Sequence, residues 1–94
     1  MDVAKRFGEN LRRVRRRAGI SQEELGMRSS LHRTEIGLLE RGARVPRIDT
    51  LIKIASALVI PPGELLEGID WTPGDTTTTS GQFAIAPAGD PQSN

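Results

Sequence analysis

The sequence contains no cysteine and a single histidine, His32. Without cysteine, neither a disulfide framework nor a thiolate zinc site can form, and we expect no metal and no cofactor. Long apolar runs are also missing. The most apolar stretch, LIKIASALVI, is about half the length of a membrane-spanning helix and contains Lys53. Since no apolar segment typical of a secretory signal lies near the N-terminus, we expect a cytoplasmic, nucleoid-associated protein without membrane contact.

Lysine and arginine are absent after residue 53. All 13 of them lie in residues 1–53 together with seven acidic residues, whereas residues 54–94 contain five acidic residues. The first half is therefore expected to attract a polyanion and the second half to repel one. A solvated basic helix explains the first half equally well, so charge alone does not predict nucleic-acid binding.

At 94 residues the chain has room for one small domain with a modest core. Apolar residues recur at steps of three and four near the N-terminus, which predicts one apolar stripe on a first helix. These residues are Val3, Phe7, Leu11, Val14 and Ala18.

Stop and start signals divide the rest of the segment into further helices. Gly19 suits the end of the first helix, and Ser21 with Glu24 has the spacing of a capping box. Pro61 and Pro62 end the fourth helix and open a short fifth one. We predict a compact all-α domain over residues 1–68, with five helices near 3–18, 21–28, 32–41, 48–59 and 62–67.

The core is predicted to centre on the fourth helix, which is apolar on most of its sides. Its apolar residues are Ile48, Leu51, Ile52, Ile54, Ala55, Leu58 and Val59. In the third helix region, Leu31, Ile36 and Leu39 are expected to face inward.

Residues 69–94 form a C-terminal extension of different composition. IDWT and QFAIA have apolar residues at every second position, and they flank PGDTTTTSG, which is typical of a turn. This pattern predicts a hairpin of residues 69–72 and 82–86, with a disordered tail as the alternative. The end, PAGDPQSN, is predicted to be disordered. As a working hypothesis, two such hairpins pair edge to edge and make a dimer.

The stretch ISQEELGMRSSLHRTEIGLLERG contains two short helices joined by a tight turn. It resembles the DNA-binding domain of the Cro and phage-repressor (XRE) family. The resemblance covers residues 4–67, through LRRVR, SQEEL, LERG, DTLIKIASAL and GELLEG. It implies a lambda-repressor-like fold, with the third helix in the major groove of DNA and the second helix crossing the backbone. Ser30 stands where the family usually places the glycine that adopts a positive φ.

Four residues of the third helix point away from the expected core and are carried over as the base-reading set: Arg33, Thr34, Gly37 and Leu38. The Arg33 guanidinium can pair with two acceptors of guanine. Thr34 can hydrogen-bond a base or contact a thymine methyl group, and Leu38 can cover such a methyl group. Gly37 either permits close approach to the base pairs or is a tolerated defect.

Contacts to the DNA backbone are expected from Gln22, His32, Arg44 and Arg47. Gln22 and His32 begin the second and third helices, where side chains and free N–H groups can meet a phosphate. Arg44 and Arg47 lie in the loop that in this family follows the DNA backbone or minor groove. The alternative is that both are solvated loop charges.

The resemblance also implies a partly buried ion pair beneath the recognition helix. In similar repressors an arginine of the first helix pairs with the glutamate of the LE.G motif, which here gives Arg15 and Glu40. We assign this pair to positioning the recognition helix rather than to reading bases.

These features predict a sequence-specific transcriptional regulator of double-stranded DNA, a repressor that binds an inverted repeat as a homodimer. An antitoxin or adaptor is the alternative, with a toxin or effector protein docked on the acidic half and the segment of Trp71 and Phe83. We do not expect an enzyme. The sequence has no Gly-Lys-Ser/Thr phosphate-binding run, no cluster of metal-ligand residues and no cysteine nucleophile.

Overall fold

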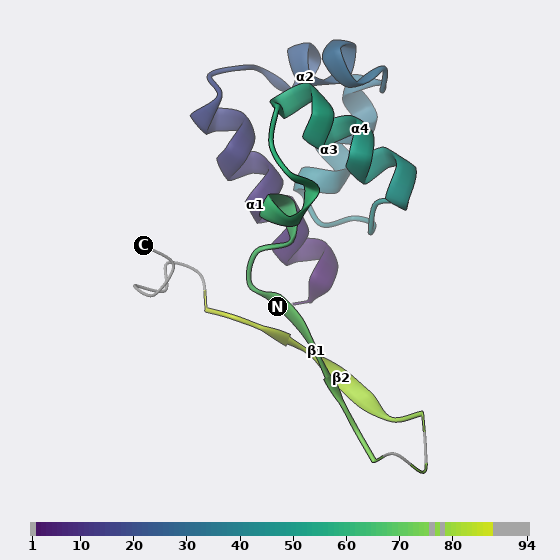
Figure 1. Ribbon diagram of the computed structural model, residues 1–94. Coiled ribbons are helices and arrows are strands. Elements are labelled where there is room, and N and C mark those ends of the chain that lie inside the picture. Colours follow the sequence, from purple (N-terminus) through teal and green to yellow (C-terminus); the bar gives the residue numbers. More distant parts are fainter. Residues whose placement is uncertain (1, 76, 78, 88–94) are drawn as a thin grey trace.

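The computed structural model describes residues 2–75, 77 and 79–87. These residues form four α-helices, one 3-10 helix and a two-stranded antiparallel sheet. In chain order the elements are α1 (Val3–Arg17), α2 (Gln22–Ser29), α3 (Arg33–Glu40), α4 (Ile48–Leu58), η1 (Pro62–Leu66), β1 (Ile69–Pro73) and β2 (Gly81–Ile85). Figure 1 shows the helices gathered into one body, with the hairpin of β1 and β2 projecting from it.

The helices begin at residues whose side chains can cap a helix, and α1 is followed by a glycine. Asp2 caps α1, because its carboxylate accepts a hydrogen bond from the backbone N–H of Lys5 at 2.8 Å. Ser21 caps α2 through the N–H of Glu24 at 3.0 Å, which confirms the predicted capping position. After α1, Gly19 has a φ of 74°, a left-handed conformation that glycine adopts without steric cost.

The core lies between α1, α2, α3, α4 and η1, and each of these elements contributes at least one buried side chain. The buried apolar residues are Phe7, Leu11, Val14, Leu25, Ile36, Leu39, Ile54, Ala55, Leu58 and Leu65. Ile36 and Leu39 are buried as predicted, and Leu31 packs against the core while only partly buried. The inward side of α3 is therefore fixed by apolar packing.

The prediction for α4 is wrong for three of its apolar residues. Ile48, Ile52 and Val59 are 77%, 50% and 88% exposed. α4 contacts α2 and η1, and the residues that it buries are Thr50, Ile54, Ala55 and Leu58. Ile48 and Ile52 lie one turn apart on a part of the helix that these neighbours do not cover, and Val59 follows the helix as its C-cap with a φ of 57°.

The predicted fifth helix is a 3-10 helix of five residues, so the domain has four α-helices rather than five. Such a short segment, which begins at the second of two prolines, closes too few hydrogen bonds for an α-helix. The buried side chain of Asn10 donates to the carbonyl oxygens of Leu65 at 3.0 Å and Glu67 at 2.9 Å. These bonds tie the end of η1 to α1 and give its last carbonyl groups a partner.

The predicted hairpin is present; β1 ends one residue later than expected, and β2 begins and ends one residue earlier. In the register Trp71 lies opposite Phe83, and their ring centroids are 5.0 Å apart in an edge-to-face arrangement. The next pair on the same face, Ile69 and Ile85, is partly buried and lies at the base of the hairpin. The end predicted to be disordered, residues 87–94, lies outside the described part of the chain except for Pro87.

A two-stranded hairpin is marginally stable alone in water, so its attachment to the helices matters. The guanidinium of Arg6, in α1, donates to the carbonyl oxygen of Ala86, which directly follows β2. The Ala86 N–H donates to the Gly68 carbonyl oxygen at 2.8 Å. Arg6 is buried in this contact, which fastens both ends of the hairpin to α1.

Within the described residues, no helix is both long and apolar enough to span a bilayer.

Candidate nucleic-acid interface

α2 and α3 are joined by a turn of three residues that is closed by local hydrogen bonds. Ser30 has a φ of 59°, the left-handed conformation expected at this position from the family resemblance. The Leu31 N–H donates to the Gly26 carbonyl oxygen at 2.8 Å, and a Cβ on Gly26 would lie only 2.8 Å from the Leu31 carbonyl oxygen. Glycine at position 26 therefore lets the turn fold closely against α2.

Two of the predicted base-reading residues are exposed on the outward side of α3. Arg33 and Thr34 are exposed, and Leu38 is half-buried. Within the described part of the chain, no hydrogen bond or ion pair engages the Arg33 side chain. The guanidinium of Arg33 is therefore available for an external partner at the first turn of α3.

His32 is the N-cap residue of α3. Its ring Nδ1 accepts a hydrogen bond from the backbone N–H of Thr34 at 3.0 Å. Since Nδ1 is the acceptor, the proton of the neutral ring lies on Nε2. His32 therefore stabilises the start of the helix and presents an N–H donor on the other side of the ring.

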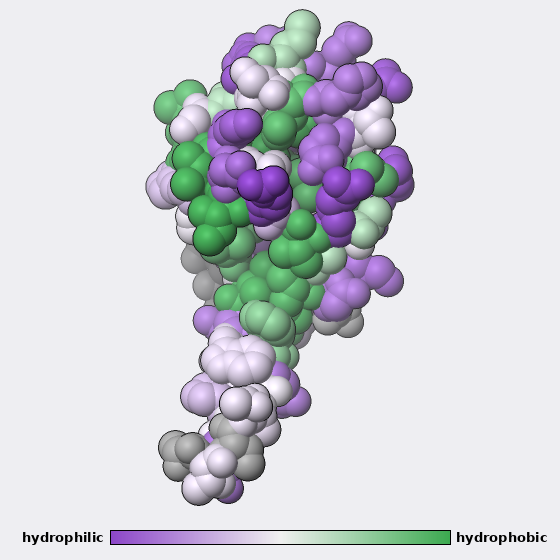
Figure 2. All heavy atoms as spheres, turned by 90° about the vertical axis from the view of Figure 1, so that its right-hand side faces the viewer, coloured by the Kyte–Doolittle hydropathy of each residue, from purple (hydrophilic) through white to green (hydrophobic). Residues whose placement is uncertain are grey.

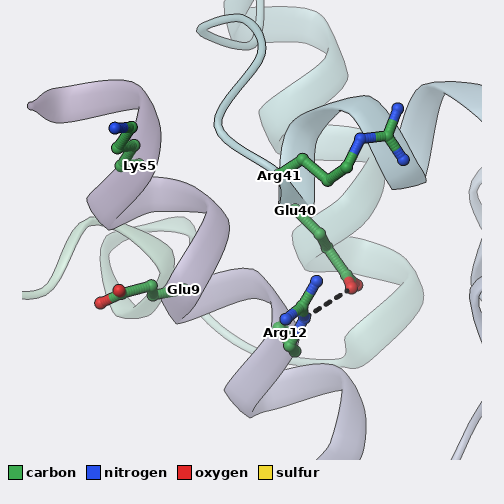
Figure 3. A pocket seen from close by; sticks show the side chains of 5 residues that line it. All are labelled: Lys5, Glu9, Arg12, Glu40 and Arg41. Carbon is green, nitrogen blue, oxygen red and sulfur yellow. Dashed lines mark hydrogen bonds and ion pairs between the residues drawn. The ribbon is translucent and has the colours of Figure 1, made fainter.

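The carboxylate of Glu40 is the centre of an ionic cluster beneath α3. Its side chain is fully buried. Arg15 donates to both oxygens, from Nε at 2.5 Å and from Nη2 at 3.0 Å. The Gln22 side-chain amide donates to Glu40 Oε1 at 3.0 Å. Arg12 Nε lies 3.4 Å from the same oxygen (Figure 3). The predicted pair of Arg15 and Glu40 is thus present, as part of a cluster that links α1, α2 and α3.

The cluster holds both main partners in their charged forms. Burial raises the pKa of Glu40, but hydrogen bonds from Arg15, Gln22 and Arg12 outweigh burial and leave this pKa below its ordinary value. The hydrogen bond to Glu40 raises the pKa of Arg15. A third donor of Arg15, Nη1, binds the Ile20 carbonyl oxygen at 2.9 Å, so this guanidinium also fixes the link between α1 and α2.

Comparison with known proteins identifies the family. A model of the helix-turn-helix family matches residues 11–65, which is more than half of the chain. The chain belongs to the helix-turn-helix family. This match confirms the resemblance to the Cro and phage-repressor (XRE) family that the sequence motifs indicated.

Three relatives place the chain among regulators of this family. It is 41% identical to the uncharacterized HTH-type transcriptional regulator y4dJ of Sinorhizobium fredii over 76 residues, which cover 81% of this chain and 99% of the relative. The crystal structure of the restriction-modification controller protein C.AhdI from Aeromonas hydrophila has 42% identity and a TM-score of 0.65, covering 66% of this chain and 94% of that one.

The third relative is the P22 c2 repressor protein, whose crystal structure is a complex with a synthetic operator. It has 31% identity and a TM-score of 0.61, and the match covers 66% of this chain and 94% of that one. These relatives are a transcriptional regulator, a controller protein and a repressor rather than enzymes. The helix-turn-helix chain described here is a DNA-binding transcription regulator.

Two predicted backbone-contacting residues of this helix-turn-helix protein lie in the loop after α3 and are ion-paired. Arg44 Nη1 lies 3.1 Å from a carboxylate oxygen of Glu35, and Arg47 Nε lies 3.3 Å from one of Asp49. All four side chains are at least partly exposed, so these pairs are weak. Arg44 and Arg47 can therefore exchange their carboxylate partners for another anion at little cost.

Sequence reasoning missed the contacts that three residues make around Glu40 and Gly37, although it expected Gln22 to meet the DNA backbone. Arg12 precedes Arg15 by one helical turn, so the i, i+3 spacing on α1 was a usable signal for its place beside Glu40. Gln22 joins the cluster only through the packing of α2 against α3, which no sequence spacing reveals. Arg41 ends α3 and lies over Gly37, which is buried instead of exposed.

An open groove of about 460 Å³ runs beside the cluster, lined by Lys5, Glu9, Arg12, Glu40 and Arg41. Figure 3 shows that Lys5 and Glu9 come from α1, and that the Arg41 side chain extends away from both of them. The groove has a charged lining of both signs, unlike the mainly apolar sites of small-molecule ligands.

Proposed function

We propose that the protein is a repressor that binds an inverted repeat as a homodimer, with α3 in the major groove. One observation carries this proposal. Arg33 and Thr34 are exposed on the outer side of a helix whose inner side is locked by the buried side chains of Ile36 and Leu39. A short helix held in this way presents its first turn to base edges at a fixed angle.

The base-reading roles follow from side-chain chemistry. The unpaired guanidinium of Arg33 donates two hydrogen bonds to the O6 and N7 atoms of guanine. Thr34 binds a base edge or a thymine methyl group, and the half-buried Leu38 covers a thymine methyl group. Gly37 does not face the base pairs directly, because it is buried and the Arg41 guanidinium lies over it.

Backbone contacts come from the residues at the starts of α2 and α3 and from the loop after α3. Gln22 begins α2 with its amide held by Glu40, and the Nε2–H of His32 donates to a phosphate. Arg44 and Arg47 leave their carboxylate partners for phosphates when DNA binds. Arg15 and Glu40 do not contact DNA in this proposal, and they keep α3 at its angle.

Replacing Arg33 with alanine tests the base-reading role. We expect the variant to lose about 1–3 kcal/mol of discrimination at one base-pair position, because the paired hydrogen bonds to guanine disappear there. Binding is measured on a panel of duplexes derived from a selected site, with one base pair changed in each. The slope of log affinity against log salt, near −0.9 per neutralised phosphate, is measured in parallel.

Arg17→Ala is the matched control, because it removes the same charge from a residue that pairs with Glu64 of η1. This control is expected to keep the full base-pair preference. Equal weakening of Arg33→Ala on every duplex, together with a shallower salt slope, would assign Arg33 to a phosphate and contradict its role in reading bases.

The dimer is proposed to form through the hairpin of β1 and β2. Trp71 and Phe83 are 51% and 56% exposed although their rings pack against each other, so about half of each residue remains accessible to a partner. Figure 2 shows apolar side chains gathered on the helical body directly above the hairpin. Pairing with the hairpin of a second copy would cover the two rings and an unpaired strand edge.

Loss of the hairpin contact is expected to convert the dimer into a monomer. We expect a chain of residues 1–68 and a full-length Trp71→Ala/Phe83→Ala variant both to have the mass of a monomer, measured by light scattering. The full-length variant controls for loss of the Arg6 contact with Ala86 in the shortened chain. A dimer mass retained in both chains would remove the hairpin from the interface.

A second candidate function uses the same exposed rings. Trp71 and Phe83, in the acidic half of the chain, offer an apolar surface for another protein such as a toxin or an effector. This role of antitoxin or adaptor is favoured if the full-length chain is a monomer and retains a protein partner after nuclease treatment.

A further inference from the structure

Arg41 lies on the outer side of α3, although it follows the last residue of the helix. It comes four residues after Gly37 and seven after Thr34, so all three share one side of α3. Its side chain folds back along the helix. A Cβ on Gly37 would be only 3.3 Å from Arg41 Nη1 and 3.6 Å from the Gln22 side-chain oxygen. The guanidinium thus occupies the space that a side chain at position 37 would enter.

No acidic partner accounts for this position. Within the described residues, the Arg41 side chain forms no hydrogen bond or ion pair, unlike those of Arg44 and Arg47 in the following loop. A cation is favoured near the negative C-terminal end of a helix. The guanidinium nevertheless lies about one turn back from that end, over Gly37, and points away from Lys5 and Glu9 (Figure 3).

The absence of a side chain at Gly37 leaves room for this guanidinium. Glycine lowers the stability of a helix relative to alanine. Gly37 lies in the middle of α3 with helical geometry and has no positive φ that would require glycine. An added Cβ would push against Arg41 Nη1, the flexible end of a side chain, rather than against backbone. Alanine at this position would therefore shift the guanidinium by a few tenths of an ångström and leave the helix intact.

We propose that Arg41 is a further base-reading residue, with a guanidinium that takes the place of a side chain at position 37. The inference rests on the proposed placement of α3 in the major groove. There the guanidinium donates to the paired acceptors of a guanine, at a base pair different from that of Arg33. Guanine is favoured over a phosphate because the guanidinium ends over the middle of α3 and not beyond its end.

Arg41→Ala is measured on the duplex panel with single base-pair changes. We expect a roughly 5-fold to 150-fold loss of preference for guanine at one position, with preferences elsewhere retained. Arg41→Lys keeps the charge but lacks the planar pair of donors. It is expected to lose most of the same preference while its salt dependence stays that of the unmodified protein.

Gly37→Ala provides the readout that a merely structural role would not move. It is expected to weaken the same guanine preference, because Nη1 must move from its place, while its midpoint of thermal unfolding stays equal or rises. In the double variant Arg41→Ala/Gly37→Ala, the preference is expected to fall no further than in Arg41→Ala alone, because both changes remove one contact.

Two results would overturn this inference while leaving the proposed function in place. One is equal weakening of Arg41→Ala on all duplexes, which indicates a phosphate contact. The other is an unchanged guanine preference in Arg41→Ala or in Gly37→Ala. Failure of the unmodified protein to discriminate among duplexes at low salt would instead remove the proposed function, and this inference with it.

Discussion

Replacing Glu40 with alanine is expected to lower the free energy of unfolding by about 3–5 kcal/mol, because it leaves a buried charge without its partner. The Arg15 side chain is 11% exposed and donates to both Glu40 oxygens. After the replacement it keeps only the Ile20 carbonyl oxygen, and too little of it is exposed for water to replace the carboxylate. Gln22 also loses the acceptor that holds its amide.

The measurement is chemical unfolding of Glu40→Ala beside Glu24→Ala as the matched control. Glu24 pairs with Arg28 one turn away on α2, and both side chains are substantially exposed. Removing this surface pair is expected to cost about 0.3–0.5 kcal/mol. If both replacements cost the same, the Glu40 cluster does not hold α3 in place. DNA binding by Glu40→Ala is expected to fall on all duplexes, because the whole of α3 shifts.

Gly8→Ala is expected to destabilise the protein by about 1–3 kcal/mol through overpacking between α1 and α3. A Cβ on Gly8 would lie 2.5 Å from the Leu39 carbonyl oxygen and 2.6 Å from that of Glu40. Both obstacles are backbone atoms at the end of α3, so they cannot rotate away as a side chain would. The two helices would have to separate, which would also disturb the contacts of Glu40 with α1.

Gly63→Ala is the control for this prediction, because no atom lies within 4 Å of a Cβ at that position. Its effect on the free energy of unfolding is expected to stay within about 0.5 kcal/mol, as for most surface replacements. Equal stability of the Gly8→Ala and Gly63→Ala variants would show that α1 and α3 can separate without cost. The close packing of these helices would then not be needed for the position of α3.

The apolar residues of α1 and the glycine and serine signals of the first half allowed the helices of that half to be placed within two residues. This works because a helix of this length buries one side. The apolar residues of that side therefore recur every three or four positions in the sequence. The same reasoning failed for α4, where Ile48 and Ile52 are apolar yet exposed. Periodicity cannot identify the covered side when nearly all sides are apolar. It also could not distinguish a 3-10 helix from an α-helix in a segment as short as η1.

The candidate interface was predictable to the extent that motif and spacing determine it. The outward place of Arg33 and Thr34 and the pairing of Arg15 with Glu40 both follow from positions in the motif. The amide of Gln22 on Glu40 and the guanidinium of Arg41 over Gly37 do not. These two arrangements depend on the rotamers that the long side chains adopt once the helices have packed. Those torsion angles cannot be derived from the sequence.

Local patterns in the sequence alone determined the helices, the tight turn between α2 and α3, and membership of the helix-turn-helix family. Tertiary structure decided which apolar residues are covered, which charges are paired and which guanidinium groups are left for a partner. The reason is physical. Helix formation depends on neighbours three or four residues away, whereas burial and ion pairing depend on contacts such as that of Glu40 with Arg15, which lie 25 residues apart.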